Sequence, residues 1–116
     1  SVLFIDIDHF HAINESMGHL IGDEALQVLA ERIGPVVGGR GFLSRFAGDE
    51  FVAIAPGVDN AGAMDMARRV RTAVAQPIEG DGYKLFLTAS VGISRSPEHG
   101  DSGMALLRRA EAAMTR

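Results

Sequence analysis

Several residue types that support particular kinds of protein are scarce or missing in this chain of 116 residues. Cysteine is absent, which excludes disulfides, thiolate metal sites and cysteine nucleophiles and fits a reducing compartment such as the cytoplasm. Basic residues are in the minority, since 11 Lys and Arg face 15 Asp and Glu, for a net charge of −4. A nucleic-acid polymer is therefore not expected as a partner, because such partners are held largely through phosphate contacts.

Long hydrophobic runs are also missing. The apolar run near the start, Val2 to Ile5, is far shorter than a membrane span, and no basic leader precedes it. We therefore expect no direct membrane contact. With 47% hydrophobic residues, residues 1–116 are expected to form a single domain with one core. This domain is expected to be incomplete at both ends, because the chain opens directly on a strand pattern and stops inside a helical one.

Hydrophobic spacing predicts the order of helices and strands. Val2 to Ile5, followed by Asp6-Ile7-Asp8, indicates a buried strand whose end reaches solvent. The later predicted elements are helical segments over Phe10 to Met17 and Ala25 to Ile33 with a stop at Gly34-Pro35, hairpin strands Phe42 to Phe46 and Phe51 to Ile54, a helix from an Asp59 cap to before Pro77, a long strand Leu85 to Ser94 and a last helix from Ser102 through Met114. This order predicts an α/β fold, a central sheet with an antiparallel hairpin and helices packed outside.

Four acidic residues lie where strands end or turn. Asp6 and Asp8 are two apart on the first strand and should project to one side, and Asp49 and Glu50 occupy the hairpin turn. If the hairpin pairs beside the first strand, these carboxylates meet. Like charges at short range raise one another's pKa, and a magnesium ion with its phosphates relieves that repulsion. The alternative is that these acids are simply solvated or cap a helix.

A second polar group follows the first strand. Asn14, His19 and Asp23 lie in the short helical region and its glycine-bounded loop. An Asn with an Asp supplies the donors and acceptors that a purine edge requires. The alternative is ordinary capping, with Asp23 after Gly22 as the start of a helix.

Short segments along the chain form an ordered set: Asp6-Ile7-Asp8-His9-Phe10, Asn14, Gly18-His19, Gly22-Asp23, Arg45 to Phe51, Ser90 to Ile93 and Leu106 to Met114. In sequence and spacing they resemble the GGDEF family of diguanylate cyclases, over essentially the whole chain. The resemblance implies a fold like that of nucleotide cyclases and polymerase palms. Asn14 to His19 and the final segment also resemble GGDEF domains fused to a cyclic di-GMP phosphodiesterase (EAL) domain.

The resemblance implies a reaction and a set of residues. Family members condense two GTP into cyclic di-GMP, with each subunit of a homodimer presenting one GTP, by metal-assisted nucleotidyl transfer. The implied ligands of magnesium or manganese are Asp6, the backbone carbonyl of Ile7, Asp49 and Glu50. The implied substrate-binding residues are Asn14, His19, Asp23 and Gly48. Asp49 and Glu50 are also the implied catalytic residues, with Asp49 as the base.

Two departures from the family pattern bear on activity. Ala47 stands where the first glycine of the name-giving motif is usual, and His11 stands where a phosphate-stabilising lysine is usual. The leading hypothesis is a diguanylate cyclase with sensory or EAL domains attached. The alternatives are a GTP-sensing regulatory domain of a cyclic di-GMP phosphodiesterase, without turnover, and a purely structural dimerisation module.

Overall fold

A computed structural model describes residues 1–39, 41–80 and 82–94 of the chain. Its elements are β1 (Val2–Ile7), α1 (Phe10–Met17), α2 (His19–Val37), β2 (Phe42–Ala47), β3 (Glu50–Ile54), α3 (Asn60–Val74), β4 (Ile78–Gly80), β5 (Tyr83–Leu85) and β6 (Ala89–Ser94). The last predicted helix, from Ser102 through Met114, lies outside the described residues.

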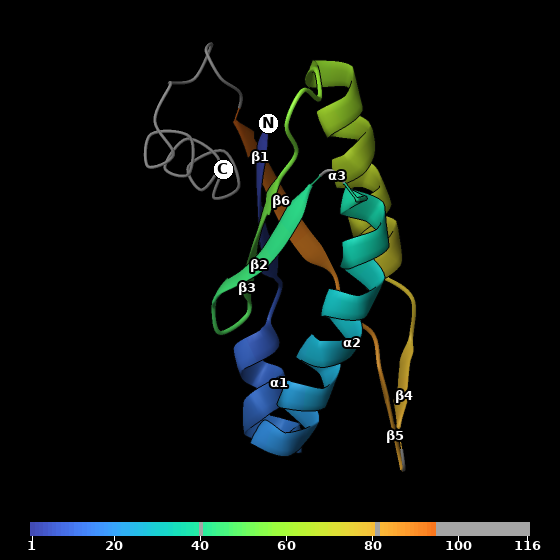
Figure 1. The fold of residues 1–116 in the computed structure, drawn as a ribbon. Coiled ribbons are helices and arrows are strands. Elements are labelled where there is room, and N and C mark those ends of the chain that lie inside the picture. Colours follow the sequence, from blue (N-terminus) through green and yellow to red (C-terminus); the bar gives the residue numbers. More distant parts are fainter. Residues whose placement is uncertain (40, 81, 95–116) are drawn as a thin grey trace.

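The main sheet has four strands in the order β2-β3-β1-β6 (Figure 1). All its pairs are antiparallel, and β1 is hydrogen-bonded to β3 on one side and to β6 on the other. The predicted hairpin is confirmed as β2 and β3. It joins the sheet through β3, which leaves β2 at the edge of the described sheet and places the hairpin turn beside the end of β1.

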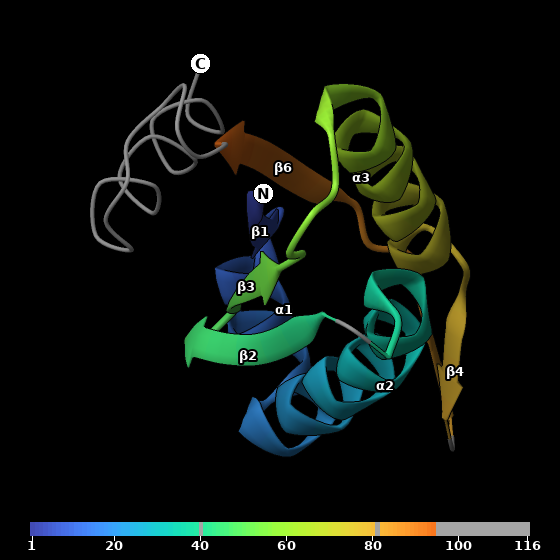
Figure 2. The same cartoon turned by 45° about the horizontal axis from the view of Figure 1, so that its top comes forward.

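The helices α2 and α3 stand on the same side of this sheet in both views (Figures 1 and 2). They contact each other, and α2 also contacts β2 while α3 contacts β6. The β1 residues that face this layer alternate along the strand, as a two-residue period requires, and are Leu3, Ile5 and Ile7. Fully buried partners from the helices are Leu29, Ile33, Val70 and Val74. Burying each such side chain stabilises the fold by about 1.5–3 kcal/mol.

The second helix is longer than predicted at both ends. It begins at His19, before the predicted Ala25 and before the alternative start at Asp23, and continues through Gly34 and Pro35 to Val37. Pro35 cannot donate the helical hydrogen bond to the residue four positions earlier, but its φ is compatible with a helix, and α2 continues for two more residues after it. Gly38 follows the last helical residue as the C-cap, and its φ of 86° favours glycine.

The long strand predicted from Leu85 to Ser94 is wrong, because the structure divides this stretch into β5 and β6. β5 pairs with β4 in a separate two-stranded sheet, with Leu85 opposite Ile78. The Tyr83 hydroxyl donates to Glu24 Oε2 of α2 at 2.7 Å, which holds this small hairpin against the helix. Alternation of hydrophobic residues alone did not reveal that the strand changes sheets.

No helix in the described ranges has the length and hydrophobicity needed to cross a membrane.

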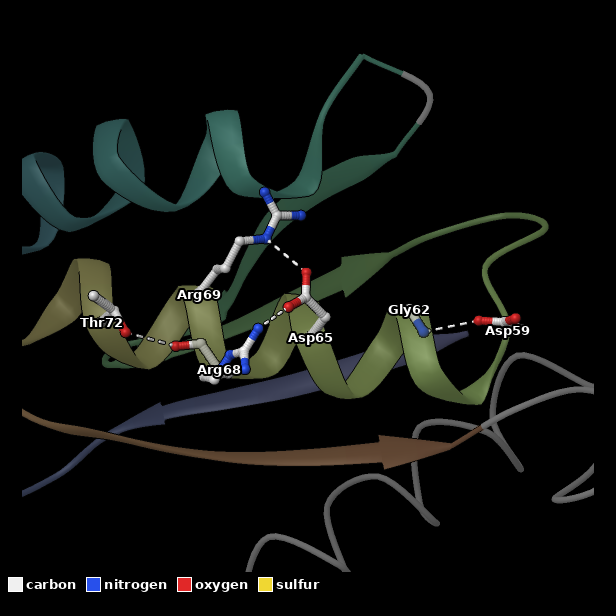
Figure 3. A network of polar contacts seen from close by, with 6 residues as sticks. All are labelled: Asp59, Gly62, Asp65, Arg68, Arg69 and Thr72. Atoms are coloured by element: carbon white, nitrogen blue, oxygen red, sulfur yellow. Dashed lines mark hydrogen bonds and ion pairs between the residues drawn. The ribbon is translucent and has the colours of Figure 1, made fainter.

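The predicted cap of α3 is confirmed. Asp59 Oδ1 accepts a hydrogen bond from the Gly62 N–H at 2.8 Å (Figure 3). One turn further, Asp65 pairs with both Arg68 and Arg69 on the exposed surface of the helix. Exposed pairs of this kind contribute little, so the Asp59 cap is the main polar contribution at this end of α3.

Replacing Asp59 with Ala should lower the free energy of unfolding by about 1 kcal/mol, because the Gly62 N–H loses its partner. Urea denaturation measures this change. Asp59→Asn keeps a side-chain oxygen acceptor and should retain most of the stability. Equal stability of Asp59→Ala and the unchanged chain would contradict the assigned role of the cap.

Candidate functional site

The end of β1 brings together acids from two parts of the chain. Asp6 lies directly opposite Glu50 of β3 and Ser90 of β6. Side chains at paired positions of antiparallel strands share one face of the sheet. The turn that carries Asp49 is held to the same strand end, because the Ile7 N–H donates to the Asp49 carbonyl at 3.1 Å. The predicted meeting of the hairpin turn with the first strand is therefore what the structure shows.

The electrostatics of Asp6 reflect this crowding. Burial, followed by the negative charges of Asp49, Glu50 and Asp8 and a hydrogen bond with Asp49, raises the pKa of Asp6 from 3.8 to about 6. The folded domain therefore holds a proton on Asp6 more tightly than the unfolded chain does. A cation bound among these acids would remove the repulsion that causes part of this shift.

Asp8 has a different role from Asp6. β1 ends at Ile7, so Asp8 lies just beyond the strand. Its carboxylate accepts hydrogen bonds from the hydroxyls of Thr88, at 2.8 Å, and Ser90, at 2.7 Å. Its N–H donates to the Thr88 carbonyl at 2.9 Å. Asp8 thus joins the end of β1 to the start of β6, a function that the two-residue spacing from Asp6 did not predict.

The acids around Asp6 suit a hard divalent cation. Asp6, Asp49 and Glu50 offer carboxylate oxygens, and magnesium or manganese prefers oxygen ligands. Within the described ranges, however, no three acidic or histidine side chains already surround a single point. The backbone places these acids next to one another, but the side chains are not arranged as a finished coordination shell.

A cavity of about 180 Å³ adjoins this end of the sheet. It lies between α1, α2 and the β2–β3 turn, and its lining residues are Phe10, His11, Asn14, Asp23, Leu26, Arg45, Gly48 and Asp49. Three of the four predicted substrate-binding residues, Asn14, Asp23 and Gly48, therefore come together, with the acid Asp49 at the same cavity.

Asn14 has an unusual environment. Its Oδ1 is buried and, among the described residues, has no hydrogen-bond partner. Buried acceptors are normally paired, so this oxygen is suited to a donor on a ligand. Gly22 allows α2 to pass close to Asn14, because a Cβ at Gly22 would overlap Asn14 Oδ1. The requirement for glycine at position 22 is thus steric and does not involve an unusual backbone angle.

His19 and three of the four predicted metal-site residues lie outside this cavity. His19 is the first residue of α2 and is exposed, and it does not line the cavity. Asp6, Ile7 and Glu50 also do not line it. The structure therefore separates most of the predicted residues into a group that lines the cavity and a group of acids at the strand end, with Asp49 in both and His19 in neither.

Two features of the site were missed by sequence reasoning. Arg45 lines the cavity, although it was noted only as part of a matching segment. Its place on the strand before the turn acids was the available signal. His9, between β1 and α1, has a φ of 57°, a left-handed conformation that is uncommon outside glycine. This conformation turns the chain immediately after Asp8, and no sequence pattern predicted it.

Comparison with known proteins defines the class. Residues 1–116 match the family described as "Diguanylate cyclase, GGDEF domain". The chain belongs to the GGDEF family, which confirms the resemblance found in its motifs.

Curated relatives are much longer than this chain. The cyclic di-GMP phosphodiesterase NbdA of Pseudomonas aeruginosa is 40% identical over 114 residues, which are 98% of this chain and 15% of NbdA. The diguanylate cyclase DgcP of the same organism is 35% identical over 113 residues, which are 97% of this chain and 17% of DgcP. The chain thus spans less than a fifth of these proteins, in which a GGDEF domain is one part of a larger protein.

Solved structures confirm the fold class. The GGDEF domain of YfiN (TpbB) from Pseudomonas aeruginosa gives a TM-score of 0.93 at 37% identity, with 98% of this chain and 72% of that chain covered. A sensory box/GGDEF family protein from Caulobacter crescentus gives a TM-score of 0.91 at 38% identity, with 99% and 75% covered. The α/β fold of nucleotide cyclases and polymerase palms, expected from the sequence, is therefore correct.

Asp6→Asn should stabilise the domain in the absence of divalent metal. Folding raises the pKa of Asp6 from 3.8 to about 6. The protonated carboxyl of Asp6 therefore adds to the free energy of unfolding in full below pH 3.8, and this contribution is lost as pH rises through about 6. The amide carries no charge at any pH. At pH 7.5 the gain should be about 1 kcal/mol after discounting for solvent screening.

Urea denaturation with a chelator present, at pH 5 and pH 7.5, measures this effect. The difference between Asp6→Asn and the unchanged chain should grow toward pH 7.5. Glu31→Gln, an exposed acid on α2, is the control and should show no such growth. A destabilised Asp6→Asn at pH 7.5 would rule out the repulsion described above.

Gly22→Ala should lower the free energy of unfolding by about 1–3 kcal/mol, since the new methyl group forces Asn14 and α1 to move. Gly34→Ala on the same helix is a matched control, because a Cβ there meets nothing within 4 Å. That control should be neutral or stabilising by about 0.5–1 kcal/mol. Thermal denaturation of both variants distinguishes steric conflict from a general effect of removing glycine, and similar behaviour of the two would show that the Asn14 contact is unimportant.

Proposed function

We propose that this chain is a GTP- and magnesium-binding GGDEF domain with diguanylate cyclase chemistry, which condenses two GTP into cyclic di-GMP in second-messenger signalling. The observation that carries the proposal is the juxtaposition of Asp6, Asp49 and Glu50 at the end of β1, where burial and mutual repulsion raise the pKa of Asp6 to about 6. Manganese has similar ligand preferences and can replace magnesium here. We place the domain in the cytoplasm, where GTP is available.

In this proposal the chain's own residues divide the work. Asp6, Asp49, Glu50 and the Ile7 carbonyl hold the metal. Bound magnesium would neutralise phosphate charge and lower the pKa of the attacking 3′-hydroxyl. Asp49 borders both the acids and the cavity, so it is placed to accept the proton from that hydroxyl.

Recognition of the base is assigned to the cavity. Asp23 and the buried Asn14 Oδ1 are acceptors for the N1–H and 2-amino donors of guanine. Gly48, with φ of 44°, lets the backbone of the turn approach the phosphates without a Cβ. His19, at the exposed start of α2, is assigned to the outer edge of the substrate site. Each domain presents one GTP, so catalysis requires a homodimer in which two such sites face each other.

A second function is favoured by two observations. Among relatives, NbdA and the Escherichia coli protein PdeR, 34% identical over 113 residues, are cyclic di-GMP phosphodiesterases. In this chain the neutral form of His11 stabilises phosphate charge less well than a lysine would, and Ala47 stands where the first glycine of the name-giving motif is usual. Under this alternative the domain binds GTP without turnover and regulates an attached phosphodiesterase domain. A purely structural role is disfavoured, because it leaves Asn14 Oδ1 and the crowded acids without a use.

Calorimetry on the full-length protein tests the binding step that both functions share. GTP should bind in the presence of magnesium, and the affinity should fall by at least about tenfold in Asp6→Asn, because an amide is a weaker, uncharged ligand. ATP should bind more weakly than GTP, since adenine leaves Asp23 without a donor. Glu31→Gln should bind like the unchanged protein. Equal affinity with and without the charge of Asp6 would exclude the proposed metal site.

Product analysis then separates the two functions. Full-length protein incubated with GTP and magnesium should form cyclic di-GMP, and Asp49→Asn should abolish that product because both a metal ligand and the base are lost. GTP binding without any cyclic di-GMP would instead establish the sensing function.

A further inference from the structure

Arg45 occupies a position that the metal and base assignments do not use. It lies on β2 opposite Phe51 of β3, so its side chain is on the helix-covered face of the sheet, at the edge strand. Together with Asp23 and Leu26 it lines both the 180 Å³ cavity and an adjoining cavity of about 500 Å³. Arg45 and Asp23 thus stand on the common wall of two cavities that lie next to each other.

The charge of Arg45 is unusual for this region. Among the described residues that line the two cavities, it is the only Arg or Lys. His11, the other basic residue there, is paired with Glu15 at 2.9 Å. Within the described part of the chain, Arg45 itself forms no ion pair or side-chain hydrogen bond with any residue, although Asp23 and Asp49 line the same cavity. Its guanidinium donors therefore remain available to a ligand.

We propose that Arg45 is a specificity-determining residue that donates hydrogen bonds to O6 and N7 of guanine. This inference rests on the proposed GTP-binding function and adds the residue that reads the acceptor edge of the base. Position favours the base over the phosphates: Arg45 shares both cavities with Asp23, whereas Asp6 and Glu50 line neither.

The chemistry of the two side chains matches the two edges of guanine. Guanine presents N1–H and 2-amino donors on one edge, which a carboxylate and an amide oxygen accept. It presents O6 and N7 acceptors on the other, and the planar guanidinium fork of arginine binds them in a bidentate manner. Adenine has an amino donor where guanine has O6, so the same guanidinium opposes it. Asp23 and Arg45 together therefore select guanine from both edges.

Nucleotide analogues that lack single atoms test this assignment on the full-length protein with magnesium. 7-Deaza-GTP lacks the N7 acceptor, and ITP lacks the 2-amino donor. The unchanged protein should bind GTP about tenfold more tightly than 7-deaza-GTP. In Arg45→Ala this ratio should fall to about one, while the ratio of GTP to ITP affinity stays unchanged. Arg45→Lys keeps the charge but not the fork and should also lose most of the N7 discrimination.

Arg71→Ala is the matched control, since Arg71 is an exposed arginine on α3 away from both cavities. It removes one positive charge and should leave both ratios intact. Circular dichroism checks that every variant is folded. An Arg45→Ala variant that weakens GTP and 7-deaza-GTP equally would overturn the inference and assign Arg45 to the phosphates.

The same titrations distinguish this inference from the proposed function. Binding of GTP by the unchanged protein with no preference over 7-deaza-GTP would overturn the role of Arg45 alone. Failure of the unchanged protein to bind GTP at all would overturn both.

Discussion

β1 is hydrogen-bonded along its length to β3 on one side and to β6 on the other, and the positions of the functional residues follow from this pairing. Because Asp6 is opposite Glu50 and Ser90 in register, a slip of one residue would turn Asp6 toward the helices and into the core. Leu3, Ile5 and Ile7, buried against α2 and α3, prevent that slip. The hydrophobic core on one face thus sets the position of the acids on the other.

Much of the fold could be predicted because its signals are local. The apolar run before Asp6 indicated a buried strand, the acidic turn at Asp49 indicated a hairpin, and Asp59 indicated a helix cap. Each depends on residues within a few positions of one another, and the structure contains all three. For the candidate site, local patterns left ordinary capping open for Asn14 and Asp23, and their assignment to the substrate came from the resemblance to the GGDEF family.

The features that sequence reasoning missed depend on long-range contacts. Asp8 is bound by Thr88 and Ser90, some eighty residues away, and nothing near Asp8 in the sequence reveals these partners. The division of the Leu85 to Ser94 stretch depends on pairing with β4, which requires knowledge of a second sheet. Arg45 gains its significance only when β2 is placed beside α2. These properties depend on contacts between residues that are distant in sequence, so local patterns do not predict them.

The raised pKa of Asp6 has an evolutionary consequence. If an uncharged residue at this position folds better than aspartate, then random substitution there is opposed by ligand binding and not by folding. Replacing Asp6 with an uncharged residue would then give a domain with the same fold and a higher free energy of unfolding. Under that condition, a domain that lost this acid would lose metal-dependent GTP binding without a penalty in folding. The proximity of Asp49 and Glu50 to Asp6 therefore costs folding free energy at neutral pH when no cation is bound.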